Sequence, residues 1–461
     1  MSIDALVHHA AAAARRVAAA AAAIGLLATA LPAAAAMPDV QQWTTDNGAR
    51  VMFIEAHEIP AVNVQMTFAA GSARDGEHPG IAHLASDLLM SGTADMDADA
   101  LARAYENEGA EVSTGAARDM GWVEFRSLSE DEHLQPVART VARMTAAPAF
   151  PDAEIERVRS QQKTSLENKA QSPGDLARRA FWKAAYGDHP YAHEPLGTPD
   201  SLDATTRADL QAFHDRYYVA RNANLAIVGD LTRERAQALA ETLTGPLAAG
   251  KPAPALPPVP KLEHDRTIHQ PFPSTQAHVL IGRPAIARGY ERWPALYVAN
   301  HVLGGGGFSS RLMTEVREKR GLVYGVYSYV SPMAAAGPFI IGLQTRGDQT
   351  DQAVGIVRKE FDRFYDEGPT TDEVDDAVKN IAGGFPLRID SNADLSGYLS
   401  MMGFYGLPTD YLSRFRNEVR EVDATAAHAA FADAVGQRPR VTVIVGGDRA
   451  DSGHQGGQGA Q

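Results

Sequence analysis

The stretch from His83 to Asp87 has the spacing of a metal-binding helix. In the motif HxxEH, histidines four residues apart present two imidazoles to a zinc ion, and the glutamate polarises the attacking water. Here His83 keeps the first ligand, but Ser86 stands at the glutamate position and Asp87 at the second histidine position. Aspartate can bind zinc, whereas serine cannot take up the proton of a bound water as a carboxylate does. The sequence therefore predicts a zinc-peptidase motif without its general base.

Two interpretations of this stretch remain open. His83 and Asp87 could hold a metal as a pair, or they could form an ordinary i, i+4 hydrogen-bonded pair with Ser86 merely exposed. We favour the second. The expected helix, 79–90, has its apolar residues on one face and the three polar residues on the opposite face. We therefore expect all three polar side chains to point away from the core.

The composition limits the class of protein. With 461 residues, 44% hydrophobic and 22% charged, the chain is long enough for two to four globular domains. The absence of cysteine excludes disulfides, thiolate metal sites and cysteine nucleophiles. A formal net charge of −14 argues against nucleic acid as a partner, because phosphate binding needs a basic surface. Histidine and carboxylate must therefore carry any metal chemistry.

The first 36 residues have the pattern of a secretory signal peptide. Arg15 and Arg16 precede an apolar run over 17–31, and small residues at 33–36 offer a cleavage site. The run is too short and too rich in alanine for a transmembrane helix. A secreted chain with a large core and no disulfides suits a bacterial periplasm. We predict a periplasmic protein with no membrane association beyond its signal peptide.

The rest of the chain has an α+β pattern that is predicted to consist of two domains. Strand patterns at 41–56 and 62–70 predict a strand pair, and 111–128 predicts a hairpin. Five prolines in 248–260 indicate a stiff linker. The predicted boundaries are an N-terminal domain at 37–247, a linker at 248–262, a C-terminal domain at 263–448 and a disordered tail at 449–461.

Two local echoes favour an internal duplication. The segment that begins at Phe150 opens a helix much as the segment that begins at Pro369 does. The strand at 225–230 is echoed by the strand at 441–448. The alternative is that α+β domains share helix caps and strand turns without common descent.

Taken in order, these motifs resemble the insulinase/pitrilysin (inverzincin) family of metallopeptidases, in particular its bacterial members similar to mitochondrial processing peptidase. The resemblance covers about residues 41–447. The matching segments are 71–75, 80–87, 91–93, 191–198, 304–312 and 317–324. It implies two similar α/β-sandwich halves that close like a clamshell around an unfolded peptide, in subunits that often work as pairs.

The resemblance also implies where a third zinc ligand should lie. In the family this ligand is a glutamate about 76 residues past the second histidine, which falls here on Lys163 or Thr164. Lysine has no free lone pair at neutral pH, and a threonine hydroxyl is a poor zinc ligand. Glu167, one turn further on, could substitute only if the register slips. The resemblance therefore predicts the family fold without zinc, and positions His83, Ser86, Asp87 and Thr164 are degenerate.

Two residues of the C-terminal half match the family's substrate-binding pair. Arg317 and Tyr324 are seven residues apart, as are the family's arginine and tyrosine that hold the substrate carbonyl. Guanidinium and phenol are donors suited to a peptide oxygen that gains negative charge. The alternative is a surface arginine and a core tyrosine in a strand.

A glycine run precedes this pair. In related heterodimers a longer glycine-rich segment of the non-catalytic subunit lines the substrate entry, which predicts a similar role here. The alternative is a helix C-cap and loop, because glycine accepts positive φ. The run consists of Gly304, Gly305, Gly306 and Gly307.

Together these observations predict a non-catalytic, zinc-free subunit of a heteromeric zinc peptidase. It would complete the peptide chamber and supply Arg317 and Tyr324 to a homologous subunit that carries the zinc. It would hold no cofactor itself and would not be active alone. Two alternatives are a self-sufficient metallopeptidase with an unusual His83/Asp87 metal site, and a peptide-binding scaffold that supports no hydrolysis.

Overall fold

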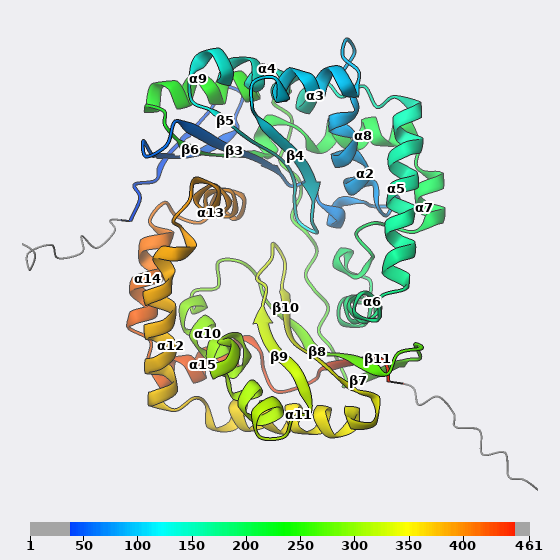
Figure 1. Ribbon diagram of the computed structural model, residues 1–461, viewed down its shortest axis with the longest axis vertical. Coiled ribbons are helices and arrows are strands. Elements are labelled where there is room, and N and C mark those ends of the chain that lie inside the picture. The colour runs from blue at the N-terminus through cyan, green and yellow to red at the C-terminus, as the bar shows by residue number, and fades with distance from the viewer. Residues whose placement is uncertain (1–36, 448–461) are drawn as a thin grey trace, which may run out of the picture. The chain divides into compact units, whose positions relative to one another are not determined.

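The computed structural model describes residues 37–447. The predicted signal peptide and the predicted tail lie outside these described residues. Two separate β-sheets with flanking helices make up this part of the chain (Figure 1). No helix in the described part has both the length and the apolar character needed to cross a membrane.

The first sheet has six strands in the order β1-β2-β6-β3-β5-β4. They are β1 (Gln41–Thr44), β2 (Arg50–Glu55), β3 (Ala61–Phe68), β4 (Glu111–Ala116), β5 (Gly121–Leu128) and β6 (Ala223–Gly229). The predicted hairpin is β4 and β5, which pair antiparallel. The predicted pairing of 41–56 with 62–70 is wrong, because β6 lies between β2 and β3. Every residue of β6 is buried, so this strand belongs in the middle of the sheet.

The second sheet has five strands in the order β7-β11-β8-β10-β9. They are β7 (Arg266–Gln270), β8 (Gln276–Ile286), β9 (Val323–Val330), β10 (Gly337–Arg346) and β11 (Val441–Gly446). Without β1, the first sheet has the same order and the same strand directions: β6 and β11 each run parallel to one neighbour and antiparallel to the other. The predicted duplication is confirmed, and the two echoed strands are β6 and β11.

Helices follow the same repeat. The first half contains α2 (Ile81–Leu88), α3 (Ala98–Glu106), α4 (Asp131–Ala146), α5 (Asp152–Ala170), α6 (Pro173–Tyr186), α7 (Pro199–Ala204), α8 (Arg207–Tyr217) and α9 (Arg233–Thr244). The second half contains α10 (Trp293–Asn300), α11 (Thr350–Glu367), α12 (Thr371–Gly384), α13 (Asn392–Tyr405), α14 (Tyr411–Arg420) and α15 (Ala424–Ala434). The echoed helix starts belong to α5 and α12, which occupy equivalent places in the two halves.

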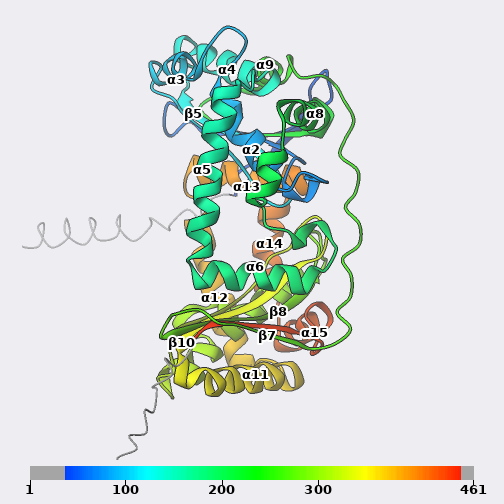
Figure 2. The same cartoon turned by 90° about the vertical axis from the view of Figure 1, so that its right-hand side faces the viewer.

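One helix of each half packs against the sheet of the other half. α6 packs against β8 and β11 of the second sheet, and α13 packs against β2, β3 and β6 of the first (Figures 1 and 2). Phe181 of α6 is fully buried in one apolar cluster with Leu280 and Val443 of the second sheet. The core of each half therefore contains side chains that the chain delivers from the other half.

A buried carboxylate also joins the two halves. Asp119, which is 5% exposed, accepts a hydrogen bond from the Tyr191 hydroxyl of its own half. From the second half it accepts hydrogen bonds from the backbone N–H of Ala334 and from the Tyr405 hydroxyl, both at 2.8 Å. Tyr191 in turn accepts a hydrogen bond of 3.0 Å from the N–H of Ala335. The contact between the halves is thus partly a network of oriented polar groups.

The segment between α9 and β7 connects the halves in an extended conformation without helix or strand over 248–263 (Figure 2). His189 Nε2 lies 2.9 Å from the carbonyl oxygen of Pro257. Leu256 and Val259 pack against the apolar cluster beneath α6. We call this proline-rich segment, residues 248–263, the strap; it runs in an extended conformation along the surface of the protein.

Candidate functional site

The start of α2 is fixed by a buried aspartate. The carboxylate of Asp75 accepts hydrogen bonds from the backbone N–H of Gly80 at 2.7 Å and of Ala82 at 3.1 Å. His193 Nε2 lies 3.1 Å from the same carboxylate. Burial raises the pKa of Asp75, against these hydrogen bonds, which favour its ionised form. Three of the segments singled out in the sequence, 71–75, 80–87 and 191–198, therefore meet at one end of α2.

The polar residues of α2 do not all point away from the core. Ser86 is fully buried, His83 is half-buried, and only Asp87 is exposed. The prediction is wrong for Ser86 because α2 packs against the sheet at β4 and β5 and also against α5 and α8. The Tyr218 hydroxyl, just after α8, approaches Ser86. A helix with neighbours on several sides has no free polar face.

The expected pair of His83 and Asp87 does not form. No hydrogen bond or ion pair joins the two side chains within residues 37–447, and His83 Nε2 is buried without a hydrogen-bond partner there. Burial raises the pKa of Asp87 to about 6, against the favourable charge of Arg157.

The surroundings of His83 are partly cationic. Burial lowers the pKa of His83 to about 4, and the charges of Lys169 and Arg118 lower it further, while Glu194 opposes them. The Lys169 ammonium donates a hydrogen bond of 2.8 Å to Glu194 Oε1. Glu194, the carboxylate that raises the pKa of His83, is therefore already paired with a lysine. The sequence analysis did not predict the Lys169–Glu194 pair, because neither residue lies at a characteristic spacing from the motif at 83–87.

Helix α5 does not provide a third zinc ligand. The Thr164 hydroxyl donates to the carbonyl oxygen of Ser160 in its own helix at 3.0 Å, and the Lys163 ammonium pairs with Asp203. Gln162 is the residue of this turn that reaches α2, where its amide donates to the carbonyl oxygen of Gly80 at 3.2 Å. No cluster of three or more His, Asp or Glu side chains in the described part of the chain could hold a metal ion.

The donors around His83 therefore do not fit zinc. One imidazole and one carboxylate that do not contact each other leave the ion without the three protein ligands that a catalytic zinc site uses. The nearby lysine and arginine would repel a divalent cation. With Ser86 in place of the glutamate, no step of a zinc-water mechanism can be assigned to this chain.

Arg317 and Tyr324 do lie together, as the sequence predicts. Arg317 belongs to the π-helical turn Met313–Glu318, and Tyr324 is the second residue of β9. The Arg317 guanidinium lies 5.7 Å from the centre of the Tyr324 ring and 4.8 Å from that of Phe308. The Tyr324 side chain is 91% exposed, so the alternative of a core tyrosine is wrong. Phe308, 67% exposed, is a further member that sequence reasoning missed.

Tyr324 also borders a recess between β9 and α6. Tyr327 and Tyr329 line it beside Arg178 of α6, and the recess has a volume of about 270 Å³. The rings of Tyr327 and Tyr329 are stacked with centroids 6.1 Å apart. These tyrosines were not predicted as site residues, although their spacing of two along a strand places them on one face.

The glycine run has a packing explanation. A Cβ on Gly304 would lie 2.6 Å from the backbone nitrogen of Ser328 in β9, and Gly307 has a φ of +63°. Side chains at Gly305 and Gly306 would meet the preceding helical turn at 2.7 and 2.8 Å. The close contacts account for Gly304, Gly305 and Gly306, and the positive φ accounts for Gly307, in a tight turn against β9. A role in substrate entry stays a prediction.

Duplicated α+β halves with a helix exchanged between them, and a HxxEH-type helix in the first half, define the class of the protein. The model of the insulinase family, peptidase family M16, matches residues 50–199, and the model of the peptidase M16 inactive domain matches residues 204–381. The chain belongs to the insulinase family.

Relatives and solved structures agree with this assignment. An uncharacterized zinc protease of Streptomyces coelicolor is 28% identical over 376 residues, which cover 79% of this chain and 80% of that protein. The non-peptidase homolog YmxG of Helicobacter pylori is 25% identical over 381 residues, covering 81% and 86%. The crystal structure of a peptidase M16 inactive domain from Pseudomonas fluorescens matches with a TM-score of 0.87 and 38% identity, covering 89% of this chain and 98% of that one.

Proposed function

We propose that this chain is the zinc-free subunit of a heteromeric insulinase-family peptidase, and that it supplies Arg317 and Tyr324 to a zinc-bearing homologous subunit. The observation that carries the proposal is the contrast between two sites. The donors around His83 do not fit zinc, whereas Arg317 and the highly exposed Tyr324 lie together as carbonyl-binding donors. Such a chain can hold a peptide but cannot activate the water that cleaves it.

The surface beside Tyr324 supports peptide as the ligand. β9 is the edge strand of its sheet. The N–H of Val326 and the C=O of Ser328 are already bonded to Met313 and Asn300, so an extended peptide could pair only with the remaining outer groups of the strand. Tyr327 and Tyr329 give the adjoining recess aromatic walls, which provide contact area at a low cost in side-chain entropy. The name of the Helicobacter pylori relative, a non-peptidase homolog, is consistent with loss of hydrolysis. The signal-like N-terminal sequence supports a periplasmic location for the proposed complex.

A first experiment measures the metal and the activity of the purified chain by itself. We expect far less than one equivalent of zinc and no cleavage of unfolded peptides. Zinc near one equivalent together with cleavage that a chelator abolishes would instead establish a self-sufficient enzyme with an unusual metal site.

A second experiment uses the complex with a co-purifying homologue that has an intact HxxEH motif. Arg317→Ala and Tyr324→Phe are expected to lower peptide cleavage by the complex at least tenfold, because each removes a donor to the developing oxyanion. The matched control is Arg320→Ala, since Arg320 is exposed three residues away and pairs with Glu315 at 2.8 Å. Loss of activity in the control alone, or peptide binding without cleavage in every complex, would contradict the proposal.

A further inference from the structure

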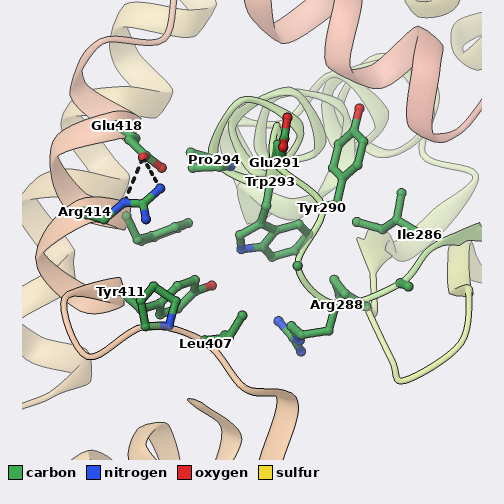
Figure 3. Close-up of a pocket in the computed structure, with 15 residues that line it drawn as sticks. Ile286, Arg288, Tyr290, Glu291, Trp293, Pro294, Leu407, Tyr411, Arg414 and Glu418 are labelled. Carbon is green, nitrogen blue, oxygen red and sulfur yellow. Dashed lines mark hydrogen bonds and ion pairs between the residues drawn. The ribbon is translucent and has the colours of Figure 1, made fainter. Parts of the chain in front are cut away.

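A second pocket lies in the C-terminal half, away from the recess at Tyr324. It opens between the start of α10 and the start of α14, and it has a volume of about 420 Å³ (Figure 3). Segments that follow β8, β9 and α13 close its sides. Its apolar walls are Ile286, Pro294, Pro332, Leu407, Pro408 and Phe415. None of these residues belongs to the motifs that define the family.

Three polar groups point into this pocket toward one another. Figure 3 shows the guanidinium of Arg288, the indole nitrogen of Trp293 and the hydroxyl of Tyr411 facing the same space. Burial raises the pKa of the Tyr411 hydroxyl, against the nearby donors Arg288 and Trp293, which lower it. Guanidinium and indole have only donors, and the phenol oxygen is the one acceptor among the three groups. The cluster therefore has more N–H and O–H groups than it can satisfy.

Arg288 is also without an anionic partner. Within residues 37–447 no carboxylate lies within ion-pair distance of its guanidinium, and its Nε is buried without a hydrogen-bond partner. Its backbone N–H donates to the carbonyl oxygen of Met333 at 2.7 Å, and its guanidinium lies 5.1 Å from the Tyr405 ring. The cation is thus held in place before any ligand arrives.

The remaining charges of the pocket set the charge of the ligand. Arg414 and Glu418 form an ion pair at 3.1 Å and neutralise each other. Glu291 lies across the Trp293 ring from Arg288 (Figure 3). One free cation and a nearby carboxylate favour a single negative charge over a doubly charged phosphate. The apolar walls favour a ligand whose charge is attached to an apolar group.

We propose that this pocket binds a carboxylate attached to an aromatic or large aliphatic group, such as the C-terminal residue of a peptide. The carboxylate would accept hydrogen bonds from Arg288 in the bidentate geometry that guanidinium prefers, with further donors from Trp293 and Tyr411. The apolar group would lie against Leu407 and Phe415. This proposal does not depend on the proposed function, because it involves neither zinc nor Arg317 nor Tyr324.

The test compares acids with their neutral amides by calorimetric titration of the full chain. The probes are N-acetyl-L-phenylalanine and its amide, and a heptapeptide that ends in phenylalanine with a free or an amidated C-terminus. Each acid is expected to bind at least about tenfold more tightly than its amide, as a charge-assisted pair requires. Binding of the small acid without the peptide acid would assign the pocket to free acids, and binding of both would assign it to peptide ends as well.

Variants locate the binding. Arg288→Gln is expected to abolish the difference between acid and amide, and Tyr411→Phe, which keeps the ring, to reduce it severalfold. Arg420→Gln is the control and should leave the difference unchanged, because Arg420 is exposed at the end of the same helix, α14, and does not line the pocket. Thermal unfolding identifies any variant that fails to fold. If Arg288→Gln does not fold, the result for Tyr411→Phe decides the test. Equal affinity for acid and amide, or no binding of any probe at millimolar concentration, would overturn the proposal.

Discussion

The carboxylate of Asp119 offers the sharpest test of how the two halves are held together. In Asp119→Asn, one oxygen becomes an NH₂ group of nearly the same size. The native carboxylate accepts from the Tyr191 hydroxyl on one oxygen, and from Ala334 N–H and the Tyr405 hydroxyl on the other. An amide has one acceptor oxygen. With its NH₂ group toward Ala334, the NH₂ meets an N–H donor; with its NH₂ group toward Tyr191, the Tyr191 hydroxyl loses the acceptor to which it donated. In either orientation a buried donor is left without its partner in a site with almost no access to water.

The magnitude follows from the number of bonds. At least one hydrogen bond to a charged group is lost, worth about 1.5–3 kcal/mol, and a buried donor is left unsatisfied at a cost of about 1–3 kcal/mol. We expect Asp119→Asn to lower the free energy of unfolding by about 3–5 kcal/mol. Tyr405→Phe removes only one of the three bonds and should cost about 1–2 kcal/mol.

The assay is urea unfolding followed by circular dichroism, with Asp188→Asn as the control. Asp188 is exposed, so its substitution should change stability by less than about 0.5 kcal/mol. Asp119→Asn and Tyr405→Phe disrupt the same contact, so the double variant should lose about 1 kcal/mol less than the sum of the two single changes. Strict additivity, or an Asp119→Asn variant as stable as the control, would refute the role assigned to this carboxylate.

Three further predictions concern Asp87 in α2 and the glycine run before β9. Burial raises the pKa of Asp87 from 3.8 to about 6, so the native chain loses stability as the pH rises from about 4 to about 6 and the loss is complete above pH 6. Asp87→Asn should therefore be more stable than the native chain by about 1 kcal/mol at pH 8, with the difference gone below about pH 3 in urea titrations. A difference independent of pH would exclude this. Asp87→His restores the histidine spacing, yet elemental analysis should still find no stoichiometric zinc, because α5 supplies no third ligand; one bound equivalent would contradict that reading. Gly304→Ala should lower the free energy of unfolding by about 1–3 kcal/mol through the contact with Ser328, whereas Gly355→Ala, which meets no atom within 4 Å in α11, should be neutral or stabilising.

The sequence predicts what depends on local pattern and on ordered motifs. The duplication, the β4–β5 hairpin and the meeting of Arg317 with Tyr324 are all found in the structure. The burial of Ser86 could not be predicted, because helical periodicity describes one helix and Tyr218 arrives from a distant part of the chain. The same holds for β6, which enters between two strands that are neighbours in sequence.

The candidate sites show the same division. Counting residues from the motif leads to Thr164, but it does not reveal the Lys169–Glu194 pair near His83, since no motif contains it. The pocket around Arg288 is assembled from several separate segments, none of which has an unusual composition. Convergence of donors in space has no signature in a single sequence, and it becomes visible only when the segments are folded.

The exchange of α6 and α13 has a consequence for the strap at 248–263. Each half is completed by a helix that the chain places in the other, so a cut in the strap would separate the polypeptide into two pieces without separating their cores. We expect the two fragments to co-elute in gel filtration after such a cut, and either fragment expressed alone to be insoluble. The strap thus keeps the two halves in one chain and at a high local concentration. The packing of α6 and α13 is what holds the folded halves together.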